Sequence, residues 1–400
     1  MSETIPLHDV GADTSFPGRK ADITQHEIEA LEVEHNLADA HTHQRQSQGQ
    51  QEIVEGLPSL WYESEATTQR ESELAFKKAF YNFHGQRKAL DRIDDIYLTY
   101  AASISMQVVA TYLRQNNCSV GLVEPCFDNL HDLMKHAGLE ISPIHEDALY
   151  DCDKIQSNLD AYARDLDAIV WVDPNNPTGF SLFAPNDRAF REVVSYCEAN
   201  GKILVLDFCF SAFLRTSGYR RSDAYEVLEA SGVDYIAMED TGKTWPLQDT
   251  KCASLMASRR LNTEIYPIVT SVLLNVSPFI LRLVTRYVEN SKKDGLASVS
   301  EVLTTNREFL IESLPSDILE YQRPLIETSV AWLKIKTEHS ADEVQEHLRR
   351  WGVYVLPGRY FFWSQPADGH KFIRVALARD PQEFRNSISA AAASLLQLKG

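Results

Sequence analysis

Lys243, Asp207 and Asn176 each follow an apolar segment of the chain, and their side chains could together carry out chemistry on an amine. Lys243 lies just past the apolar residues 235–238, where its amine could form a Schiff base with an aldehyde. Asp207 ends another apolar run, and a buried carboxylate there needs a cationic partner. Asn176 belongs to the sequence Asp-Pro-Asn-Asn-Pro-Thr-Gly, which is also typical of a simple tight turn.

An α/β fold would bring these three side chains together. From residue 96 onward, short apolar runs alternate with longer segments of helical periodicity, which is typical of a mostly parallel sheet with crossover helices. We expect strands at 96–100, 120–123, 168–172, 203–206, 235–238 and 253–256, and helices at 105–115 and 187–200. Ligands of such sheets bind beyond the carboxyl ends of the strands. The active site is therefore expected at that edge.

The length of 400 residues, with 44% hydrophobic content, is sufficient for a large domain at 66–285 and a smaller α/β domain at 286–400. In the second half we expect one long helix at 278–313, strands at 330–335 and 372–376, and helices at 341–351 and 381–398. Residues 1–65 are polar and helix-prone, and are expected to form an arm that covers the active site and part of the small domain. Residues 44–51 are expected to be its least structured part.

Composition excludes several classes of partner. A formal net charge of -18 argues against nucleic acid and anionic membranes, and is compatible with a cationic small substrate. No apolar run reaches the ~20 residues of a membrane span, and the first residues do not resemble a signal peptide, so we expect a cytoplasmic protein. The six scattered cysteines form no C-x-x-C pair and predict neither a metal site nor disulfides.

The order and spacing of Asn-Asn-Pro-Thr-Gly, Asp207 and Lys243 resemble those of the fold-type I pyridoxal phosphate (PLP) enzymes of the aminotransferase class I/II family, over nearly the whole chain. This resemblance implies that Lys243 forms a Schiff base with PLP, that Asp207 pairs with the pyridine nitrogen and keeps the ring an electron sink, and that Asn176 donates a hydrogen bond to its O3′. Phe127 matches the aromatic residue that stacks on the ring, although a core phenylalanine would give the same pattern.

Further residues are candidates for binding the cofactor phosphate and the substrate carboxylate. Ser103 and Ser105 open a predicted helix, whose amino terminus is a natural seat for a phosphate. Lys251 stands where relatives commonly carry an arginine bound to the same phosphate. Arg374 lies in a predicted small-domain strand, where the family binds the substrate α-carboxylate with an arginine.

Two segments depart from an ordinary aminotransferase. The family's Asp-x-x-Tyr is Asp207-Phe-Cys-Phe210 here, so a hydroxyl that would bond O3′ is missing. Glu239 and Asp240 replace the small hydroxyl residues usual before the lysine. Two carboxylates at this place suit a cationic substrate side chain, although one of them could simply cap the following turn.

The amino-terminal arm carries the third departure. Thr24 and Glu27 have the spacing of a helix capping box, and Asn36, Asp39 and His41 are polar residues in an otherwise helical stretch. The sequences at 24–27, 36–41, 239–246 and 276–281 together resemble those of the PLP-dependent L-arginine oxidases and hydroxylases of natural-product pathways.

This second resemblance implies that the arm closes over L-arginine, that Thr24, Glu27 and Asp240 contact the guanidinium, and that His41 approaches the reactive carbons. Lys243 would remove the α-proton, and dioxygen would accept electrons from quinonoid intermediates. The products would be 4-hydroxy-2-ketoarginine, a 4,5-dehydro-2-iminoarginine or ketoarginine, or both, with hydrogen peroxide and ammonia. The resemblance also implies a homodimer.

Two other functions remain open from the sequence. One is a conventional aminotransferase, or an enzyme similar to capreomycidine synthase, that acts on a basic amino acid without oxygen. The other is a binding or regulatory protein with a PLP-enzyme fold, which retention of Lys243 disfavours. The sequence does not separate hydroxylation from desaturation.

Overall fold

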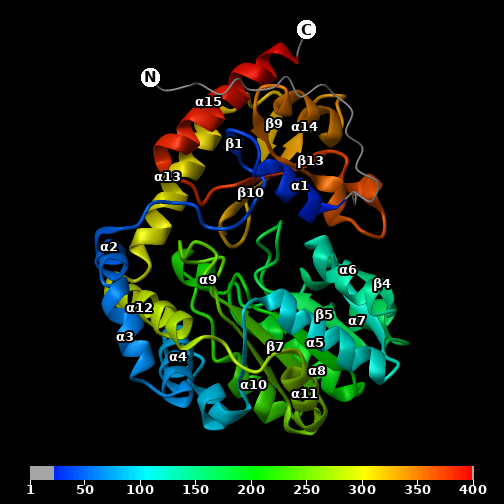
Figure 1. The fold of residues 1–400 in the computed structure, drawn as a ribbon. Helices are drawn as coiled ribbons and strands as arrows, with labels where there is room; N and C mark the ends of the chain where they lie inside the picture. Colours follow the sequence, from blue (N-terminus) through cyan, green and yellow to red (C-terminus); the bar gives the residue numbers. More distant parts are fainter. Residues whose placement is uncertain (1–21, 399–400) are drawn as a thin grey trace.

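The computed structural model describes residues 22–398, and a seven-stranded sheet lies at the centre of its larger half (Figure 1). The strands run in the order β2-β8-β7-β6-β5-β3-β4, and only β8 is antiparallel to its neighbours. Their bounds are β2 (Tyr97–Thr99), β3 (Ser119–Glu124), β4 (Glu140–His145), β5 (Ala168–Val172), β6 (Ile203–Asp207), β7 (Tyr235–Asp240) and β8 (Ala253–Ala257). The six predicted strands and the mostly parallel α/β class are confirmed.

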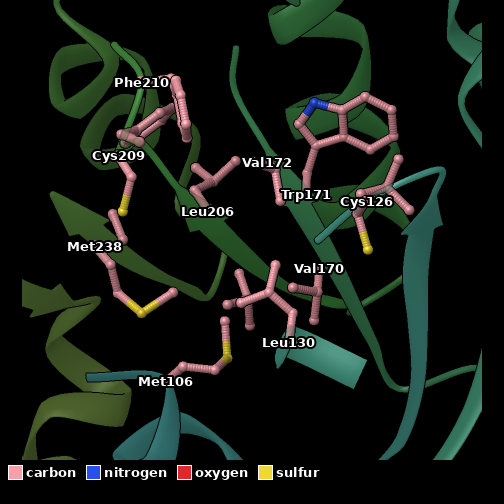
Figure 2. Close-up of a cluster of buried hydrophobic side chains, with 14 of the residues drawn as sticks. Met106, Cys126, Leu130, Val170, Trp171, Val172, Leu206, Cys209, Phe210 and Met238 are labelled. Atoms are coloured by element: carbon pink, nitrogen blue, oxygen red, sulfur yellow. The ribbon is translucent and has the colours of Figure 1, made fainter. Parts of the chain in front are cut away.

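Strands β5, β6 and β7 are buried along their whole length, which explains why they are almost entirely apolar. Figure 2 shows Val170, Leu206 and Met238 of these strands beside Met106 and Leu130 of two covering helices. The helices of this half are α5 (Ala102–Gln115), α6 (Asp128–His136), α7 (Ile155–Ala163), α8 (Arg188–Ala199), α9 (Ala212–Thr216), α10 (Ala224–Ser231) and α11 (Arg259–Val272), with the 3-10 helices η1 (Arg87–Asp95) and η2 (Glu146–Leu149).

A second, antiparallel sheet has the order β12-β13-β10-β9. Its strands are β9 (Leu319–Tyr321), β10 (Val330–Ile335), β12 (Leu356–Pro357) and β13 (Phe372–Ala376), and nearby lie α14 (Ala341–Arg349), α15 (Pro381–Gln397), η3 (Gly358–Phe361) and η4 (Pro366–Gly369). The predicted strands at 330–335 and 372–376 are confirmed. The two sheets lie within the predicted ranges 66–285 and 286–400, whose boundaries stay predictions.

The prediction of one helix at 278–313 is wrong. The segment forms α12 (Pro278–Asp294) and α13 (Ala297–Ser313), with a sharp break between them. Gly295 and Leu296 have φ angles of 65° and 70°, in the left-handed region that ends a helix. Lys292, Lys293 and Gly295 together form an ordinary helix stop signal that the apolar periodicity of the segment concealed.

The described part of the arm contains α1 (Ile23–Ala30), β1 (His35–Asn36), α2 (Gln48–Glu55) and α3 (Leu57–Glu65), followed by α4 (Gln69–Phe83). Strand β1 pairs with β11 (Val353–Tyr354) in a separate two-stranded sheet. The Ala376 amide of β13 donates to the Leu37 carbonyl at 2.8 Å, so the arm lies against the second sheet (Figure 1). Two expectations are wrong. Residues 35–41 are not helical, and the glutamine-rich segment is partly ordered, because Ser47 and Gln50 form a capping box that starts α2. Residues 1–21 of the predicted arm lie outside the described residues.

No helix within residues 22–398 is long and apolar enough to cross a membrane.

Gly179 joins the turn at 173–179 to the second half of the chain. Its φ angle is 70°, and its carbonyl accepts a 2.9 Å hydrogen bond from the Ile326 amide. A Cβ atom there would lie 2.4 Å from the Ile326 carbonyl oxygen. We therefore expect Gly179→Ala to lower the free energy of unfolding by at least about 2 kcal/mol, from backbone strain and displacement of the neighbouring segment. Urea unfolding measures this loss.

Gly201→Ala is the matched control. Gly201 has a φ angle of 62°, but a Cβ atom there meets nothing within 4 Å. Only the backbone strain, about 1 kcal/mol, should appear. If both variants lost the same free energy of unfolding, the added Cβ atom at residue 179 would be accommodated by a shift of the segment around Ile326 without further cost.

Candidate active site

A cavity of about 250 Å³ lies beyond the carboxyl ends of β5, β6 and β7, as expected for a sheet of this kind. All but two of the predicted site residues line it. The exceptions are Ser105 and Arg374, and the residues on the wall are Thr24, Glu27, His41, Ser103, Phe127, Asn176, Asp207, Asp240, Lys243 and Lys251. Residues more than 200 positions apart in the sequence therefore share one site.

Asp207 is the last residue of β6 and is 7% exposed. Its carboxylate accepts a 2.9 Å hydrogen bond from the Cys209 amide. Burial raises the pKa of Asp207, and the positive charge of Lys243 opposes this shift. A carboxylate in such a place is stabilised by a cation held against it, and the protonated ring nitrogen of PLP is a cation of the right kind.

The two serines at the start of α5 have different surroundings. Ser103 is exposed in the first turn and lines the cavity, so it remains a candidate phosphate ligand. Ser105 is fully buried, and its hydroxyl lies 2.9 Å from the Thr99 hydroxyl. The assignment of Ser105 to the phosphate does not fit this structure, because its side chain points into the protein rather than into the cavity.

Glu239 and Asp240 point in opposite directions, because successive residues of a strand face opposite sides of the sheet. Asp240 lines the cavity and accepts hydrogen bonds from the backbone amides of Ala102, at 2.9 Å, and Gly242. Glu239 is buried on the other side, where its carboxylate pairs with the Arg221 guanidinium at 3.0 Å. The expectation that both carboxylates face a substrate is therefore wrong for Glu239.

Helix α1 closes one side of the cavity. Its N-cap is Asp22, whose carboxylate accepts a 2.7 Å hydrogen bond from the Gln25 amide, so Thr24 and Glu27 do not form a capping box. The Ile23 amide donates to the Asp128 carboxylate at 2.8 Å and fastens the helix to α6. Thr24 and Glu27 are three residues apart on one face of α1, and both line the cavity.

Arg374 on β13 is fully buried and is absent from the cavity wall. Its guanidinium lies 3.1 Å from the Glu27 carboxylate and 3.4 Å from the Asn176 side-chain oxygen, and it also donates to the Ala38 carbonyl. Glu27 and Asn176 both line the cavity. An anion that pairs with Arg374 would therefore have to compete with Glu27 for its guanidinium.

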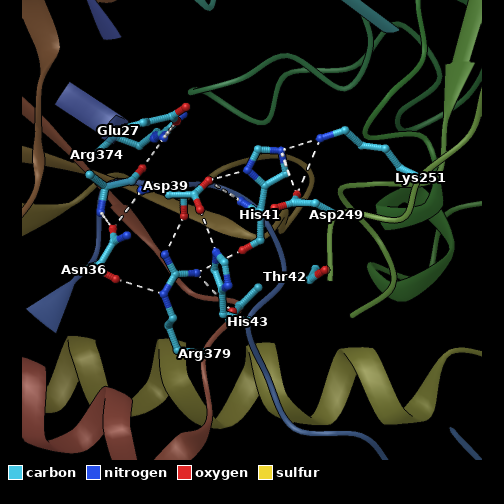
Figure 3. A network of polar contacts seen from close by, with 12 residues as sticks. Glu27, Asn36, Asp39, His41, Thr42, His43, Asp249, Lys251, Arg374 and Arg379 are labelled. Carbon is cyan, nitrogen blue, oxygen red and sulfur yellow. Dashed lines mark hydrogen bonds and ion pairs between the residues drawn. The ribbon is translucent and has the colours of Figure 1, made fainter. Parts of the chain in front are cut away.

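His41 belongs to a polar network that joins the arm to the lysine loop (Figure 3). The Asp39 carboxylate contacts His41 Nδ1 at 2.5 Å and His43 Nε2 at 2.6 Å. Burial disfavours the Asp39 charge, yet hydrogen bonds from both histidines hold the pKa of Asp39 far below its ordinary value. His41 Nε2 lies 3.1 Å from Lys251 Nζ. His41 therefore contacts the lysine predicted to bind the phosphate.

Arg379 shapes the backbone of this segment. Its buried guanidinium donates to the carbonyls of Asn36, Asp39 and His41 at 2.6 to 3.0 Å. Burial lowers the pKa of Arg379 to about 10. Arg379 thereby holds the irregular turn that presents His41 to the cavity.

Further residues on the cavity wall were given no role from the sequence, among them Asn129, Cys209 and Phe210. Cys209 and Phe210 follow Asp207 directly, so their position after the strand was the signal that could have identified them. Burial raises the pKa of the Cys209 thiol well above its ordinary value, so the group is neutral. Phe210 presents a ring without the hydroxyl of the family's usual tyrosine.

The sheet order, a lysine after β7, and a buried carboxylate ending β6 define a fold-type I PLP-dependent enzyme. The model of the aminotransferase class I and II family matches residues 64–390. The chain belongs to this family, and its cofactor is PLP.

Among solved structures, the chain is similar to MppP soaked with the product 2-ketoarginine, at 31% identity and a TM-score of 0.82, over 90% of this chain and 99% of MppP. It also resembles LysN, an α-aminoadipate aminotransferase from Thermus thermophilus complexed with N-(5′-phosphopyridoxyl)-L-leucine, at 15% identity and a TM-score of 0.74, over 95% and 96% of the two chains. Aspartate aminotransferase from Thermus thermophilus with maleate has 15% identity and a TM-score of 0.73, over 94% and 97%. A search of curated proteins found no match.

Proposed function

We propose that this protein oxidises L-arginine with dioxygen, using PLP, to 2-oxo-arginine derivatives. In the simplest case arginine, dioxygen and water give 2-ketoarginine, ammonia and hydrogen peroxide. The observation that carries the proposal is the cavity wall, where Glu27 and Asp240 add two carboxylates around Lys243. The similarity to MppP, whose structure was determined with 2-ketoarginine as product, supports the same substrate class.

The residues on the cavity wall fit the cofactor. Asp207 would pair with the ring nitrogen, Asn176 would donate to O3′, and Phe127 would lie against the ring. Ser103 and Lys251 would hold the phosphate, one with a hydroxyl at a helix amino terminus and the other with its charge. PLP supplies an electron sink for the electrons released at the substrate α-carbon.

The chain's own residues would bind the substrate and move its protons. Glu27 and Asp240, with the Thr24 hydroxyl, would hold the guanidinium of arginine, and Arg374 would take its carboxylate. Lys243 Nζ would remove the α-proton. His41 is held by Asp39 through Nδ1, so Nε2, which lies 3.1 Å from Lys251 Nζ, would be the atom that exchanges a proton near the substrate side chain.

An oxygen electrode tests the proposal. The purified enzyme with PLP and L-arginine is expected to consume dioxygen and to release peroxide and ammonia, with products identified by mass. Transfer of the amino group to a keto acid without oxygen uptake would instead establish an aminotransferase for a basic amino acid. Cyclisation of a β-hydroxylated basic amino acid, with loss of water and without oxygen uptake, would establish an activity similar to capreomycidine synthase.

His41→Ala is expected to change the ratio of hydroxylated to unhydroxylated products, because both arise from one oxidised species and differ in how water and protons reach it. Mass analysis of the product mixture measures the ratio. His43→Ala removes the other histidine on Asp39 but not the one that lines the cavity, so it is the matched control. An unchanged ratio in His41→Ala would contradict the role of His41.

The proposal includes a homodimer and a place in natural-product biosynthesis, which the resemblance to arginine oxidases implies, and a cytoplasmic location, which composition favours. Sedimentation of the purified protein tests the first of these. A monomer that turns over arginine normally would remove the dimer from the proposal.

A further inference from the structure

Glu146 carries a buried carboxylate that does not line the active-site cavity, and this carboxylate accepts three hydrogen bonds. It is the first residue of η2, directly after β4, and is 2% exposed. Its Oε2 accepts from the Thr178 hydroxyl at 2.6 Å and from the Asn175 side-chain amide, and its Oε1 accepts from the Tyr150 hydroxyl at 2.7 Å. Burial raises the pKa of Glu146, and these three donors oppose the shift.

Two of the three donors lie on the turn that carries Asn176. Asn175 and Thr178 flank Asn176 and Pro177. Glu146 therefore accepts hydrogen bonds from both sides of Asn176, the residue of this turn that lines the cavity. The backbone of the same turn is closed by a 2.8 Å hydrogen bond from the Gly179 amide to the Asn175 carbonyl. The backbone that carries Asn176 is therefore held in part through Asn175, while the Asn176 side-chain oxygen accepts from Arg374 at 3.4 Å.

Asn175 also connects this turn to the segment that carries Phe127. Its side-chain amide donates to the Pro125 carbonyl at 2.7 Å, two residues before Phe127. Asn175 is fully buried, so its amide cannot replace these partners with water. Glu146 and Asn175 thus form one contact between the loops after β3 and β5, each of which contributes a residue to the cavity wall.

We propose that Glu146 is a positioning residue, which holds Asn176 and Phe127 in place beside the cofactor through Asn175 and Thr178. The inference rests on the proposed roles of Asn176 and Phe127, but not on the proposed oxidation of arginine. Its consequences are therefore visible in the bound cofactor, without any substrate.

The test compares Glu146→Ala with Glu146→Gln. The alanine variant removes the acceptor of the Thr178 hydroxyl and one of the two acceptors of the Asn175 amide. We expect about fivefold to tenfold weaker PLP binding and an altered pH midpoint of the cofactor's visible absorbance. A glutamine oxygen can accept from both donors, while its amide donates to the Tyr150 oxygen, so Glu146→Gln should restore both values. Thr178→Val removes one donor only and should shift both values in the same direction by less.

Tyr150→Phe is the control, because it removes a hydrogen bond to the same carboxylate without touching the turn. It should lower thermal stability no more than slightly and leave the cofactor's absorbance and affinity unchanged. Loss of stability in Glu146→Ala and Thr178→Val with wild-type affinity and absorbance would overturn the proposal, since a merely structural role predicts that result. If Glu146→Ala does not fold, Thr178→Val decides by the same two readouts.

Asn176→Ala distinguishes the proposed contact of Asn176 with the cofactor from the positioning role of Glu146. If this variant shifts the absorbance midpoint and Glu146→Ala does not, the positioning role of Glu146 is wrong and the role of Asn176 stands. If Asn176→Ala itself has no effect, the proposed contact of Asn176 with the cofactor is wrong, and the positioning role falls with it.

Discussion

Lys243→Ala is expected to abolish covalent attachment of the cofactor and to lower turnover of arginine by a factor of at least about 10² to 10⁴, the usual contribution of a positioned acid–base group. Lys243 is half-buried on the cavity wall, close enough to Asp207 for its charge to affect that carboxylate. Removal of this amine takes away both the cofactor anchor and the group that would move the α-proton. The residue makes no contribution to a strand or helix, so the fold should persist.

The measurement is borohydride reduction followed by mass analysis of peptides, together with steady-state kinetics. Lys251→Ala is the matched control, because Lys251 lies on the same cavity wall eight residues away. That variant should keep the reducible linkage at Lys243 and bind PLP more weakly. A cofactor adduct found on Lys251 in the wild-type protein would show that the wrong lysine was identified.

Residues whose role depends on local sequence were predictable. Asp207 ends a buried strand, Asn176 and Lys243 each follow one, and the topology of a parallel sheet brings the ends of such strands together. Their apolar strands are continuous and fully buried, so the sequence signal is strong. Strand β4 lacked this signal because Glu140, Pro143 and His145 interrupt its apolar residues, and its position at the edge of the sheet tolerates them.

Contacts between distant segments were not predictable. Glu239 and Asp240 are adjacent in sequence, and only the direction of the strand decides that one faces the cavity while the other pairs with Arg221. Ser105 was separated from Ser103 by its position on α5, which turns its hydroxyl toward Thr99. Periodicity alone does not give the rotation of a helix at its first turn relative to a cavity.

The arm was recognised from its residues, but its contacts depend on long-range pairing. Glu27 meets Arg374, which lies 347 residues further along the chain. Nothing in either local sequence indicates that a residue expected to bind the substrate guanidinium contacts the one expected to bind the substrate carboxylate. That contact leads to a prediction about specificity.

Glu27→Gln is expected to raise the KM for L-arginine about 30-fold or more, because loss of one partner from a buried charge pair commonly costs at least about 2 kcal/mol. In the structure Glu27 pairs with Arg374 at 3.1 Å, with the guanidinium fully buried. Bound arginine would exchange this single internal pair for two: its carboxylate would take Arg374, and its guanidinium would take Glu27. A ligand with a carboxylate but no cation would separate the internal pair and leave the Glu27 charge uncompensated.

L-Citrulline has the length of arginine and a neutral side chain, so it distinguishes the two halves of this exchange. Glu27→Gln should bind citrulline as well as the wild type does or better, because residue 27 then carries no charge that citrulline would leave unpaired. The same variant should bind arginine more weakly, because the guanidinium of arginine loses its carboxylate partner. Perturbation of the cofactor's visible absorbance gives both affinities. Glu29→Gln is the control: Glu29 lies on the same helix but accepts from the Tyr354 hydroxyl at 2.9 Å, away from the cavity wall.

The ratio of the two affinities separates recognition of the guanidinium from mere support of the helix. If Glu27 only fastens α1 to Arg374, the glutamine variant should weaken arginine and citrulline by the same factor, because both need the closed arm. If Glu27 recognises the guanidinium, arginine alone should weaken, and the preference for arginine over citrulline should fall by about the same 30-fold. Because Arg374 keeps its hydrogen bonds to Ala38 and Asn176 in either case, the site for the carboxylate should survive the substitution, and only the choice of side chain should change.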